Sequence, residues 1–454
     1  MAKLFGTDGI RGEAGQFPLD PKTVRAVGAS LARHLAERAG GGSPRILIGR
    51  DTRESGPWIE QALIAGVREA GAEFRSAEVI TTPGVAYLTR TLPADAGVVI
   101  SASHNPYHDN GIKIFEPSGR KLDDITERQI EADIVGSANI TPETATQSAS
   151  SNGSAELKSL YMDYLANEVG SDLSLAKLTL VVDCANGAAY EIAPNVFRRL
   201  GARAIAINDH PNGRNINLDC GSLHIDNLQK RVVAERADLG VAFDGDADRA
   251  LFVDAAGRFV DGDATLWVLA NYLKERGELK GDTVVATVMS NIGLELALRS
   301  RGINLTRTDV GDKYVLDELL RSRAALGGEQ SGHIIFPNIS LAGDGIITTI
   351  ALLRVMREKQ QSLAELTEGV HRYPQILVNV RVREKRPFEE LPSVQRQAQE
   401  TTQKLGDQGR LLLRYSGTEP LARIMIEGRN EREMERYAND LADVIGQELG
   451  AVDS

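Results

Sequence analysis

Short, unbroken apolar runs alternate with helix-length amphipathic segments through most of this chain of 454 residues. Such runs lie at residues 45–49, 97–100, 178–182, 239–243 and 283–287. A strand that is apolar on both faces needs helices on both sides of its sheet, as in the parallel sheets of α/β proteins. The alternation therefore predicts layered α/β domains, and at roughly 150 residues per domain the length allows about three.

Shifts in composition predict where these domains end. Residues 141–154 are rich in Thr, Ser, Ala and Asn, which is typical of a linker. Further boundaries are expected near Gly257 and near residues 371–374. The last segment differs in style, with strands at 376–382, 411–414 and 423–427 and a final helix that Asn430 caps. We therefore expect domains at residues 1–150, 151–256, 257–371 and 372–454.

The charge and cysteine content exclude several classes of protein. A formal net charge of -11 argues against nonspecific binding to nucleic acids or membranes, so an anionic substrate would need local basic residues or a metal. No apolar run approaches the roughly 18 residues of a membrane helix, and no secretory signal is visible. Cys184 and Cys220 are too few for a disulfide framework or a zinc quartet. A cytoplasmic location is therefore expected.

Three apolar runs lead directly into polar loops. Residues 98–100 lead into Ser-Ala-Ser-His-Asn-Pro at 101–106, and residues 239–243 into Asp-Gly-Asp-Ala-Asp-Arg at 244–249. Residues 324–326 lead into Gly-Gly-Glu-Gln-Ser-Gly-His at 327–333. Ligands of α/β proteins bind at the carboxyl ends of strands, so the three loops predict one cleft shared between domains.

The second of these loops predicts a metal site. Asp244, Asp246 and Asp248 alternate, so in an extended segment their carboxylates can face one way. Three carboxylates without a His or Cys partner suit a hard cation such as Mg²⁺. A calcium-binding hand is excluded, because Arg249 and Ala255 stand where that loop needs Gly and Glu. The alternative is a solvated, Asp-rich turn.

The first loop offers a hydroxyl group beside an imidazole. Ser103 precedes His104, and the surrounding residues do not match the nucleophile elbow of hydrolases. Such a serine could exchange a phosphoryl group if a metal neutralised the charge. Lys113 follows as a candidate proton carrier or phosphate partner. A polar turn with a solvated lysine is the alternative.

The third of these loops and two further segments carry groups that suit sugars or phosphates. Glu329, Ser331 and His333 could bind sugar hydroxyls, or could simply belong to a Gly-rich turn. The segment 414–420 combines Arg414 with two hydroxyls and an open backbone, as a phosphate cradle does, and a helix cap is the alternative. Arg11 lies in a Gly-rich segment near the N-terminus and is another candidate anion contact.

Taken in order, these loops resemble those of the α-D-phosphohexomutase superfamily. The similarity extends from Phe-Gly-Thr-Asp-Gly-Ile-Arg-Gly at residues 5–12, through the three loops above, to Ser-Gly-Thr-Glu-Pro at 416–420. Residues 211–217, 220–222 and 328–336 are similar to the branch that acts on glucosamine phosphates. The resemblance implies three similar α/β domains and a smaller C-terminal α+β domain around a central cleft, each domain contributing one loop.

The resemblance also implies a role for each loop. Ser103 would carry the phosphoryl group, and Mg²⁺ would be bound by an oxygen of that phosphoserine together with Asp244, Asp246 and Asp248. The residues expected beside the transferring group are Arg11, His104, Lys113 and Arg249. Those expected to bind the sugar are Glu329, Ser331 and His333. Those expected to bind the phosphate that is not reacting are Arg414, Ser416, Gly417, Thr418 and Arg423.

The activity implied by the resemblance is the interconversion of glucosamine 6-phosphate and glucosamine 1-phosphate, which feeds UDP-N-acetylglucosamine synthesis. Glucosamine 1,6-bisphosphate would be intermediate and activator. The partner would then be a small phosphosugar, with no nucleic acid and no membrane, and a homodimer is left open. The alternatives are a phosphomannomutase or phosphoglucomutase, a Mg²⁺-dependent sugar phosphatase, and a non-catalytic sugar-phosphate sensor.

Overall fold

The structure is a computed structural model that describes residues 4–6, 8–38, 40, 42–136, 153–416 and 419–450. The chain forms two compact units. Unit 1 comprises residues 1–287 and 308–367, and unit 2 comprises residues 288–307 and 368–454. The expected linker lies outside the described residues up to residue 152, and helix α5 begins at Ser154.

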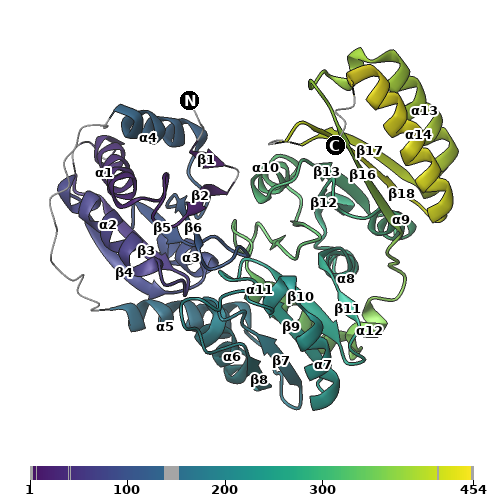
Figure 1. Ribbon diagram of the computed structural model, residues 1–454. Coiled ribbons are helices and arrows are strands. Elements are labelled where there is room, and N and C mark those ends of the chain that lie inside the picture. Colours follow the sequence, from purple (N-terminus) through teal and green to yellow (C-terminus); the bar gives the residue numbers. More distant parts are fainter. Residues whose placement is uncertain are drawn as a thin grey trace. The chain divides into compact units, whose positions relative to one another are not determined.

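The first sheet of unit 1 has six strands in the order β1-β2-β6-β5-β3-β4 (Figure 1). Strand β3 pairs in parallel with β4 and β5, whereas β5–β6, β6–β2 and β2–β1 are antiparallel pairs. Its elements are β1 (Phe5–Gly6), β2 (Gly9–Glu13), α1 (Pro21–Arg38), β3 (Arg45–Arg50), α2 (Gly56–Glu69), β4 (Glu73–Val79), α3 (Thr82–Thr91), β5 (Ala96–Ile100), β6 (Asp109–Phe115) and α4 (Asp124–Gly136).

The second sheet has five strands in the order β11-β10-β9-β7-β8. Strand β7 pairs in parallel with β8 and β9, and β9–β10 and β10–β11 are antiparallel. Its elements are α5 (Ser154–Tyr164), a π-helical turn (Leu165–Val169), β7 (Thr179–Asp183), α6 (Ala189–Arg199), β8 (Arg203–Ile207), a 3₁₀ turn (Gly221–Leu223), α7 (Asp226–Glu235), β9 (Leu239–Phe243), β10 (Ala250–Asp254) and β11 (Phe259–Val260).

A third sheet contains β12 and β14 as a parallel pair and β15 antiparallel to β14. The elements of this part of unit 1 are α8 (Gly262–Glu275), a 3₁₀ turn (Lys280–Asp282), β12 (Thr283–Thr287), α10 (Asp312–Ser322), β14 (Leu326–Gly328), β15 (Ile334–Ile335), α11 (Gly345–Lys359) and α12 (Leu363–Leu366). Strand β14 begins later than the apolar run at 324–326 predicts and includes both glycines. A Cβ on Gly328 would lie 2.5 Å from the His333 carbonyl oxygen, so glycine allows the neighbouring backbone to approach.

The same connection occurs in all three sheets of unit 1. The loops after β5, β9 and β14 each link a strand in parallel pairing to the antiparallel strand that follows it. Every residue of β5 and β9 is buried, which confirms that these apolar runs are covered on both faces. The three polar loops of the sequence therefore occupy equivalent places in three similar α/β layers.

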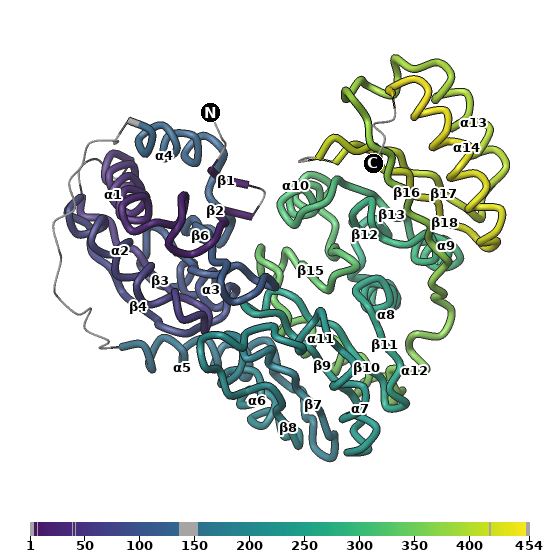
Figure 2. Tube along the Cα trace, viewed as in Figure 1, coloured from purple at the N-terminus to yellow at the C-terminus, as the bar shows by residue number. Residues whose placement is uncertain are grey.

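Unit 2 has a different architecture. Strands β16 (Gln375–Arg381), β18 (Leu421–Glu427) and β17 (Arg410–Tyr415) form an antiparallel sheet in that order. Helices α13 (Pro392–Leu405) and α14 (Glu431–Leu449) lie side by side (Figure 2), and Asn430 caps α14 by accepting a hydrogen bond from the Glu433 amide. Unit 2 also contains α9 (Ile292–Ser300), most of β13 (Asn304–Thr308), and two 3₁₀ turns (Phe388–Glu390, Gly406–Gln408). The expected α+β C-terminal segment is confirmed.

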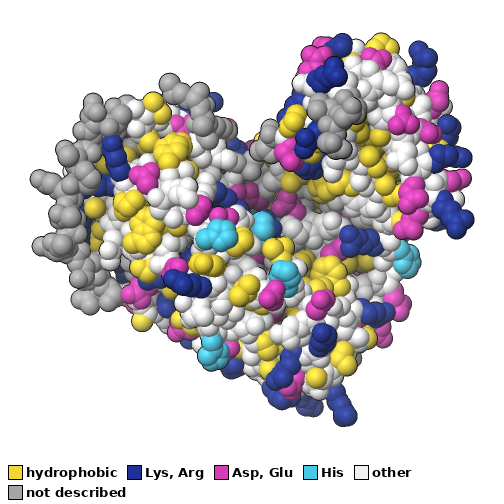
Figure 3. All heavy atoms as spheres, in the orientation of Figure 1, with side chains coloured by type: hydrophobic (Ala, Val, Ile, Leu, Met, Phe, Trp, Pro, Cys, Tyr) yellow, Lys and Arg dark blue, Asp and Glu magenta, His cyan; other side chains and the backbone are white. Residues whose placement is uncertain are grey.

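The charged surface and the polarity of the helices bear on the expectation of no membrane partner. On the face drawn in Figure 3, basic and acidic side chains are interspersed rather than gathered by sign. None of the helices in the described part of the chain is long and apolar enough to cross a membrane.

Candidate active site

Ser103 lies in the loop after β5, and its hydroxyl is buried beside two groups that can act on it. Its Oγ donates a hydrogen bond to Asp244 Oδ2 at 2.6 Å, and His104 Nδ1 lies 3.3 Å away. The chain turns sharply at Ser103, whose φ is 53°. Residues 101–106 are rich in Ser, Asn and Pro, as tight turns are. The structure thus brings the predicted nucleophile into contact with the predicted metal loop.

Asp244, Asp246 and Asp248 are buried together in the loop after β9, with ligand oxygens within 4.8 Å of one another. The expectation of an extended segment is wrong, because the loop is a turn. Ala247 has φ 58°, and its amide donates to the Asp244 carbonyl at 3.1 Å. A Cβ on Gly245 would lie 2.5 Å from the Ser103 carbonyl oxygen, so glycine is required for the two loops to approach this closely.

The aspartate cluster has the chemistry of a cation site. Burial, together with Asp248 and Asp246, raises the pKa of Asp244 well above its ordinary value. Within the described residues, Asp246 Oδ1 and Asp248 Oδ1 have no hydrogen-bond partner, although Asp248 Oδ1 lies 3.6 Å from His333 Nδ1. Buried carboxylate oxygens that repel one another and lack donors fit a hard cation such as Mg²⁺.

Lys113, on β6, neutralises part of this negative charge. Its Nζ lies 2.9 Å from Asp246 Oδ2, 3.2 Å from Asp8 Oδ2 and 3.4 Å from Asp248 Oδ2. Burial by itself would lower the pKa of Lys113, but the three carboxylates outweigh burial and raise this pKa well above its ordinary value. The ammonium is therefore charged at neutral pH, which favours phosphate neutralisation over proton transfer.

Arg249 joins the metal loop to the serine loop. Its amide donates to Asp244 Oδ1 at 3.2 Å, and its Nη1 lies 3.2 Å from His104 Nδ1. Burial and the charge of Arg249 lower the pKa of His104 to about 4. The imidazole beside Ser103 is consequently neutral at pH 7 and is a weak base.

Arg11, on β2, forms an ion pair with Asp8 and donates to Asn105 Oδ1 at 3.4 Å. Burial would raise the pKa of Asp8, but Lys113, Lys121 and Arg11 together hold it well below its usual range. The guanidinium is thus anchored at the edge of the serine loop, where it can contact an anion.

A cavity of about 400 Å³ connects these groups with the loop after β14. Glu329 accepts a hydrogen bond from the Gly311 amide at 3.2 Å, and His333 lies between Asp248 and Asp312. Burial would lower the pKa of His333, but Asp248 outweighs it and raises the pKa to about 9. Ser331 Oγ is buried and has no hydrogen-bond partner among the described residues. The residues that line the cavity include Asp8, Arg11, His104, Asp248, Arg249, Glu329 and His333.

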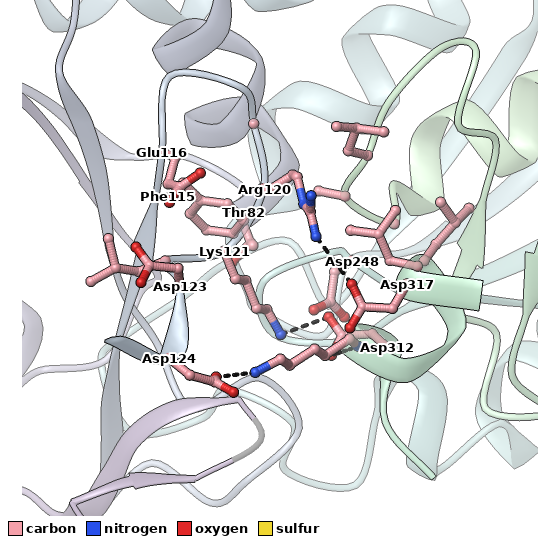
Figure 4. A pocket seen from close by; sticks show the side chains of 18 of the residues that line it. Thr82, Phe115, Glu116, Arg120, Lys121, Asp123, Asp124, Asp248, Asp312 and Asp317 are labelled. Atoms are coloured by element: carbon pink, nitrogen blue, oxygen red, sulfur yellow. Dashed lines mark hydrogen bonds and ion pairs between the residues drawn. The ribbon is translucent and has the colours of Figure 1, made fainter. Parts of the chain in front are cut away.

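A second cavity of about 470 Å³ shares Asp248 and His333 with the first. Figure 4 shows ion pairs in it between helix α10 and the segment from Arg120 to Asp124, which runs from the connection after β6 to the first residue of α4. Lys121 Nζ lies 2.6 Å from Asp312 Oδ2, Arg120 pairs with Asp317 at 3.0 Å, and Lys313 pairs with Asp124. These pairs fix the wall of the site between β6 and α10.

In unit 2, two predicted phosphate ligands lie opposite each other. Arg414 of β17 and Arg423 of β18 are directly paired in the antiparallel register. Arg423 Nη2 lies 3.3 Å from Ser416 Oγ, and burial together with Arg423 lowers the pKa of Arg414. Like charges in direct pairing are unfavourable without an anion. Gly417 and Thr418 lie outside the described residues.

The sequence did not point to Asp8, Thr82, Lys121 or Asp312, which all contact the site. Thr82 Oγ1 donates to Asp246 Oδ2 at 2.6 Å across 164 positions of sequence. A contact over that separation leaves no local pattern. Asp8 is three residues before Arg11, and this spacing of opposite charges was the one available signal.

Comparisons with known proteins agree with this geometry. Four consecutive segments match the phosphoglucomutase/phosphomannomutase family: alpha/beta/alpha domain I (residues 2–140), domain II (159–257), domain III (261–373) and the C-terminal domain (377–444). The chain is 52% identical to a phosphoglucosamine mutase of Solibacter usitatus over 99% of its own length and 100% of that relative's.

Solved structures share the fold. A phosphoglucomutase/phosphomannomutase family protein of Burkholderia thailandensis matches with a TM-score of 0.81 at 23% identity, covering 99% of this chain and 98% of that one. The N-acetylphosphoglucosamine mutase of Aspergillus fumigatus matches with a TM-score of 0.67 at 18% identity, covering 98% and 96%. With the serine and aspartate loops in contact and a relative of this similarity over its whole length, the chain belongs to the phosphoglucosamine mutase family, within the phosphoglucomutase/phosphomannomutase superfamily.

Proposed function

We propose that this chain is an isomerase that interconverts glucosamine 6-phosphate and glucosamine 1-phosphate by way of a phosphoserine at Ser103 and a 1,6-bisphosphate intermediate. The observation that carries the proposal is the 2.6 Å hydrogen bond from Ser103 Oγ to Asp244, within a buried cluster of three carboxylates. A serine in contact with a cation site is placed for exchange of a phosphoryl group. The choice of the amino sugar rests on the relative named above.

Two phosphoryl transfers make up the proposed cycle. First, O1 of glucosamine 6-phosphate attacks the phosphorus of phosphoserine. The O1–P bond forms, the bond from phosphorus to Ser103 Oγ breaks, and the proton that the O1 hydroxyl loses is balanced by the proton that Oγ takes up. The bisphosphate then reverses its orientation. Finally, Ser103 Oγ gives up its proton and attacks the 6-phosphate, and O6 takes up a proton as it leaves, giving glucosamine 1-phosphate. The imidazole of His104, 3.3 Å from Oγ, is a weak base with a pKa of about 4, so we assign it to orienting the hydroxyl beside the transferring group.

Each transfer brings one anion toward another, and the site residues counter that repulsion. A phosphoserine carries about 1.5 to 2 negative charges at pH 7. Arg11, Lys113 and Arg249 supply positive charge in the same cavity wall or next to it. Phosphoryl transfer is catalysed mainly by positioning and by stabilisation of this charge.

We assign a divalent metal, Mg²⁺, to Asp244, Asp246, Asp248 and an oxygen of the phosphoserine. When bound, it would neutralise charge on the transferring group. Two oxygens, Asp246 Oδ1 and Asp248 Oδ1, have no hydrogen-bond donor in the described part of the chain, which supports this assignment. The Aspergillus fumigatus mutase was solved in complex with GlcNAc-6P and magnesium, which supports a metal of this type beside a phosphosugar.

The remaining loops would bind the rest of the substrate. Glu329, Ser331 and His333 offer an acceptor, an unpartnered hydroxyl and a charged imidazole for the sugar. The phosphate that is not reacting is assigned to a loop in unit 2, with residues Arg414, Ser416, Gly417, Thr418 and Arg423. The direct pairing of two like charges, Arg414 and Arg423, supports an anion there, although Arg423 also pairs with Glu419 at 3.2 Å.

A substrate panel with Ser103→Ala tests the proposal. Wild-type protein should convert glucosamine 6-phosphate faster than the glucose and mannose phosphates. After incubation with glucosamine 1,6-bisphosphate, its intact mass should increase by one phosphate. Ser103→Ala should lose the isomerase activity and the mass increase. Ser43→Ala, which changes an exposed serine, should keep the activity and the mass increase. Faster turnover of another sugar would reject the substrate assignment, and release of free phosphate without isomerisation would indicate a phosphatase.

The phosphate loop has its own test. Without Arg423, the bisphosphate should escape and leave Ser103 unphosphorylated. The rate of Arg423→Ala should therefore decline over successive turnovers and recover when glucosamine 1,6-bisphosphate is added. Arg432→Ala, an exposed change on α14, is the matched control. A steady rate for Arg423→Ala without added bisphosphate would place the phosphate contact elsewhere.

A homodimer, a cytoplasmic location and the four domain boundaries stay predictions from the sequence.

A further inference from the structure

Ser103 has a backbone conformation that side chains seldom adopt. Its φ of 53° lies in the left-handed region, where residues other than glycine are uncommon and strained. Such a conformation persists only when surrounding groups maintain it. The groups that bind the main chain of Ser103 therefore decide where its hydroxyl points.

Arg53 forms hydrogen bonds with the backbone of the loop that contains Ser103. It lies between β3 and α2, is 1% exposed, and its Nε donates to Asp51 Oδ2 at 2.8 Å. Its Nη2 donates to the carbonyls of Ser103 at 3.0 Å and Asn105 at 2.8 Å. Its Nη1 donates to the carbonyls of Pro106 and, at 3.0 Å, Asp109. One guanidinium thus binds four carbonyls of the loop.

Asn217 binds two of the same carbonyls from another part of the chain. Its Nδ2 donates to the Ser103 carbonyl at 2.9 Å and to the Asn105 carbonyl at 3.1 Å. Asn217 belongs to the Pro-Asn-Gly-Arg-Asn-Ile-Asn segment at 211–217, which the proposed catalytic roles leave unused. This segment connects elements of the second sheet, the sheet that also supplies the aspartate loop.

The amide of Ser103 is fixed as well. It donates to Ser101 Oγ at 2.9 Å, and Ser101 Oγ in turn donates to Asp51 Oδ2 at 2.7 Å. Asp51 also pairs with Arg53, so the groups that bind the amide and the carbonyl of Ser103 belong to one buried network.

We propose that Arg53 and Asn217 are positioning residues for phosphoryl transfer, which maintain the left-handed turn at Ser103 and thereby aim its Oγ at the aspartate cluster. This inference rests on the proposed function. Neither side chain touches the reacting atoms; both act through the Ser103 carbonyl. Because a displacement of about 1 Å can cost about a hundredfold in rate, loss of either donor should reduce turnover more than substrate binding.

Asn217 offers the cleaner test, because Arg53 is a buried charge whose removal endangers folding. Asn217 itself has φ 58°, which Asp and Gly also tolerate. Asn217→Asp keeps the shape but replaces a donor by an acceptor facing two carbonyls, and Asn217→Gly only removes the donor. Asn215→Asp is the matched control, since the Asn215 side chain bonds within its own loop.

We expect kcat to fall by about a hundredfold in Asn217→Asp and about tenfold in Asn217→Gly, with KM within about twofold of wild type. Phosphorylation of Ser103 by glucosamine 1,6-bisphosphate, followed by intact mass, should slow by the same factors. Asn215→Asp should retain wild-type kinetics. Unchanged kcat in Asn217→Asp would overturn the proposal, as would a loss of activity explained entirely by a loss of folded protein.

Amide hydrogen exchange provides a readout that does not need turnover. The peptide covering residues 101–109 should exchange faster in Asn217→Asp than in wild type, while peptides from the second sheet should be unchanged. Equal exchange in the serine loop would overturn the positioning role even if no mutase activity were found. Failure of the bisphosphate to phosphorylate wild-type Ser103 would instead reject the proposed function.

Discussion

Two buried groups of charged side chains contact Ser103, and they differ in how completely their polar atoms are paired. In the pair of Asp51 and Arg53, the guanidinium donates to one carboxylate and four carbonyls, and the carboxylate also accepts from Ser101. In the aspartate cluster, two carboxylate oxygens have no donor among the described residues.

The difference separates two uses of buried charge. A network whose hydrogen bonds are complete is rigid and gains nothing from a ligand, so it suits the positioning of a backbone. A cluster of three carboxylates that one ammonium, Lys113, neutralises only in part gains from a further cation. The fully paired group should therefore control folding, and the incompletely paired group should control metal binding and turnover.

The largest effect on stability is expected for Asp51→Asn. This change leaves the buried guanidinium of Arg53 without a counter-charge, which costs about 3–5 kcal/mol. The midpoint of chemical denaturation should fall accordingly. Asp219→Asn, an exposed change of the same chemistry, is the control. A midpoint like that of wild type would show that hydrogen bonds alone, and not the ion pair, maintain this network.

Asp246→Asn should show the opposite pattern. It removes one of the three proposed anionic metal ligands, so turnover should fall by about a hundredfold or more, equivalent to about 2.7 kcal/mol. The denaturation midpoint should fall less than in Asp51→Asn, because Lys113 keeps Asp8 and Asp248 as counter-charges and the change relieves repulsion among the aspartates. A variant with normal turnover and unchanged metal dependence would mean that the triplet is only a structural turn.

Mg²⁺ itself should discriminate between the two groups. A ligand at 100 times its dissociation constant stabilises the folded state by about 2.7 kcal/mol, so thermal unfolding of wild type should shift upward with Mg²⁺ and return with a chelator. Asp51→Asn should keep this shift, and Asp246→Asn should lose most of it. An equal shift in Asp246→Asn would place the metal at another site.

The smallest effect is expected at Asp344, a buried carboxylate that accepts hydrogen bonds but forms no ion pair with a basic side chain among the described residues. It accepts from the amides of Ile346 and Ile347 and from Tyr161, yet burial raises its pKa to about 6. Between about pH 4 and pH 6 the folded state holds a proton that the unfolded state has lost, so this group lowers stability as pH rises.

Asp344→Asn should remove that contribution, which is at most about 1.4 kcal/mol per pH unit. Comparison of denaturation midpoints at pH 4, 5 and 6 measures it. An identical pH dependence in wild type and variant would show that three hydrogen bonds suffice to keep this carboxylate charged.

The parts of the site that follow local patterns were predictable from the sequence. The runs that become β5 and β9, the polar loops after them and the aspartate triplet all depend on neighbouring residues. The contacts of Arg53 and Asn217 with Ser103 were not, because they span 50 and 114 positions and their donors bind backbone carbonyls. Any residue type can present a carbonyl, so no pattern of side chains marks the acceptor.

The turn at Asp244–Asp248 was also beyond local reasoning. Alternating aspartates are equally compatible with an extended strand, and the deciding feature is the left-handed conformation of Ala247, which alanine does not favour. Tertiary packing imposes that conformation. The alternating aspartates therefore predicted which side chains form the cluster, but not the turn of the backbone that brings them together.

The close approach at Gly245 has a consequence for other sequences as well as for this one. Any side chain there would collide with the Ser103 carbonyl and displace the serine from the aspartates, whereas none of the three nearest atoms among the described residues belongs to the loops proposed to bind sugar and phosphate. A chain with every catalytic residue in place but alanine or serine at this position should still bind phosphosugars and should not exchange phosphoryl groups. We therefore expect one added methyl group, as in Gly245→Ala, to abolish phosphoryl exchange and to leave phosphosugar binding in place.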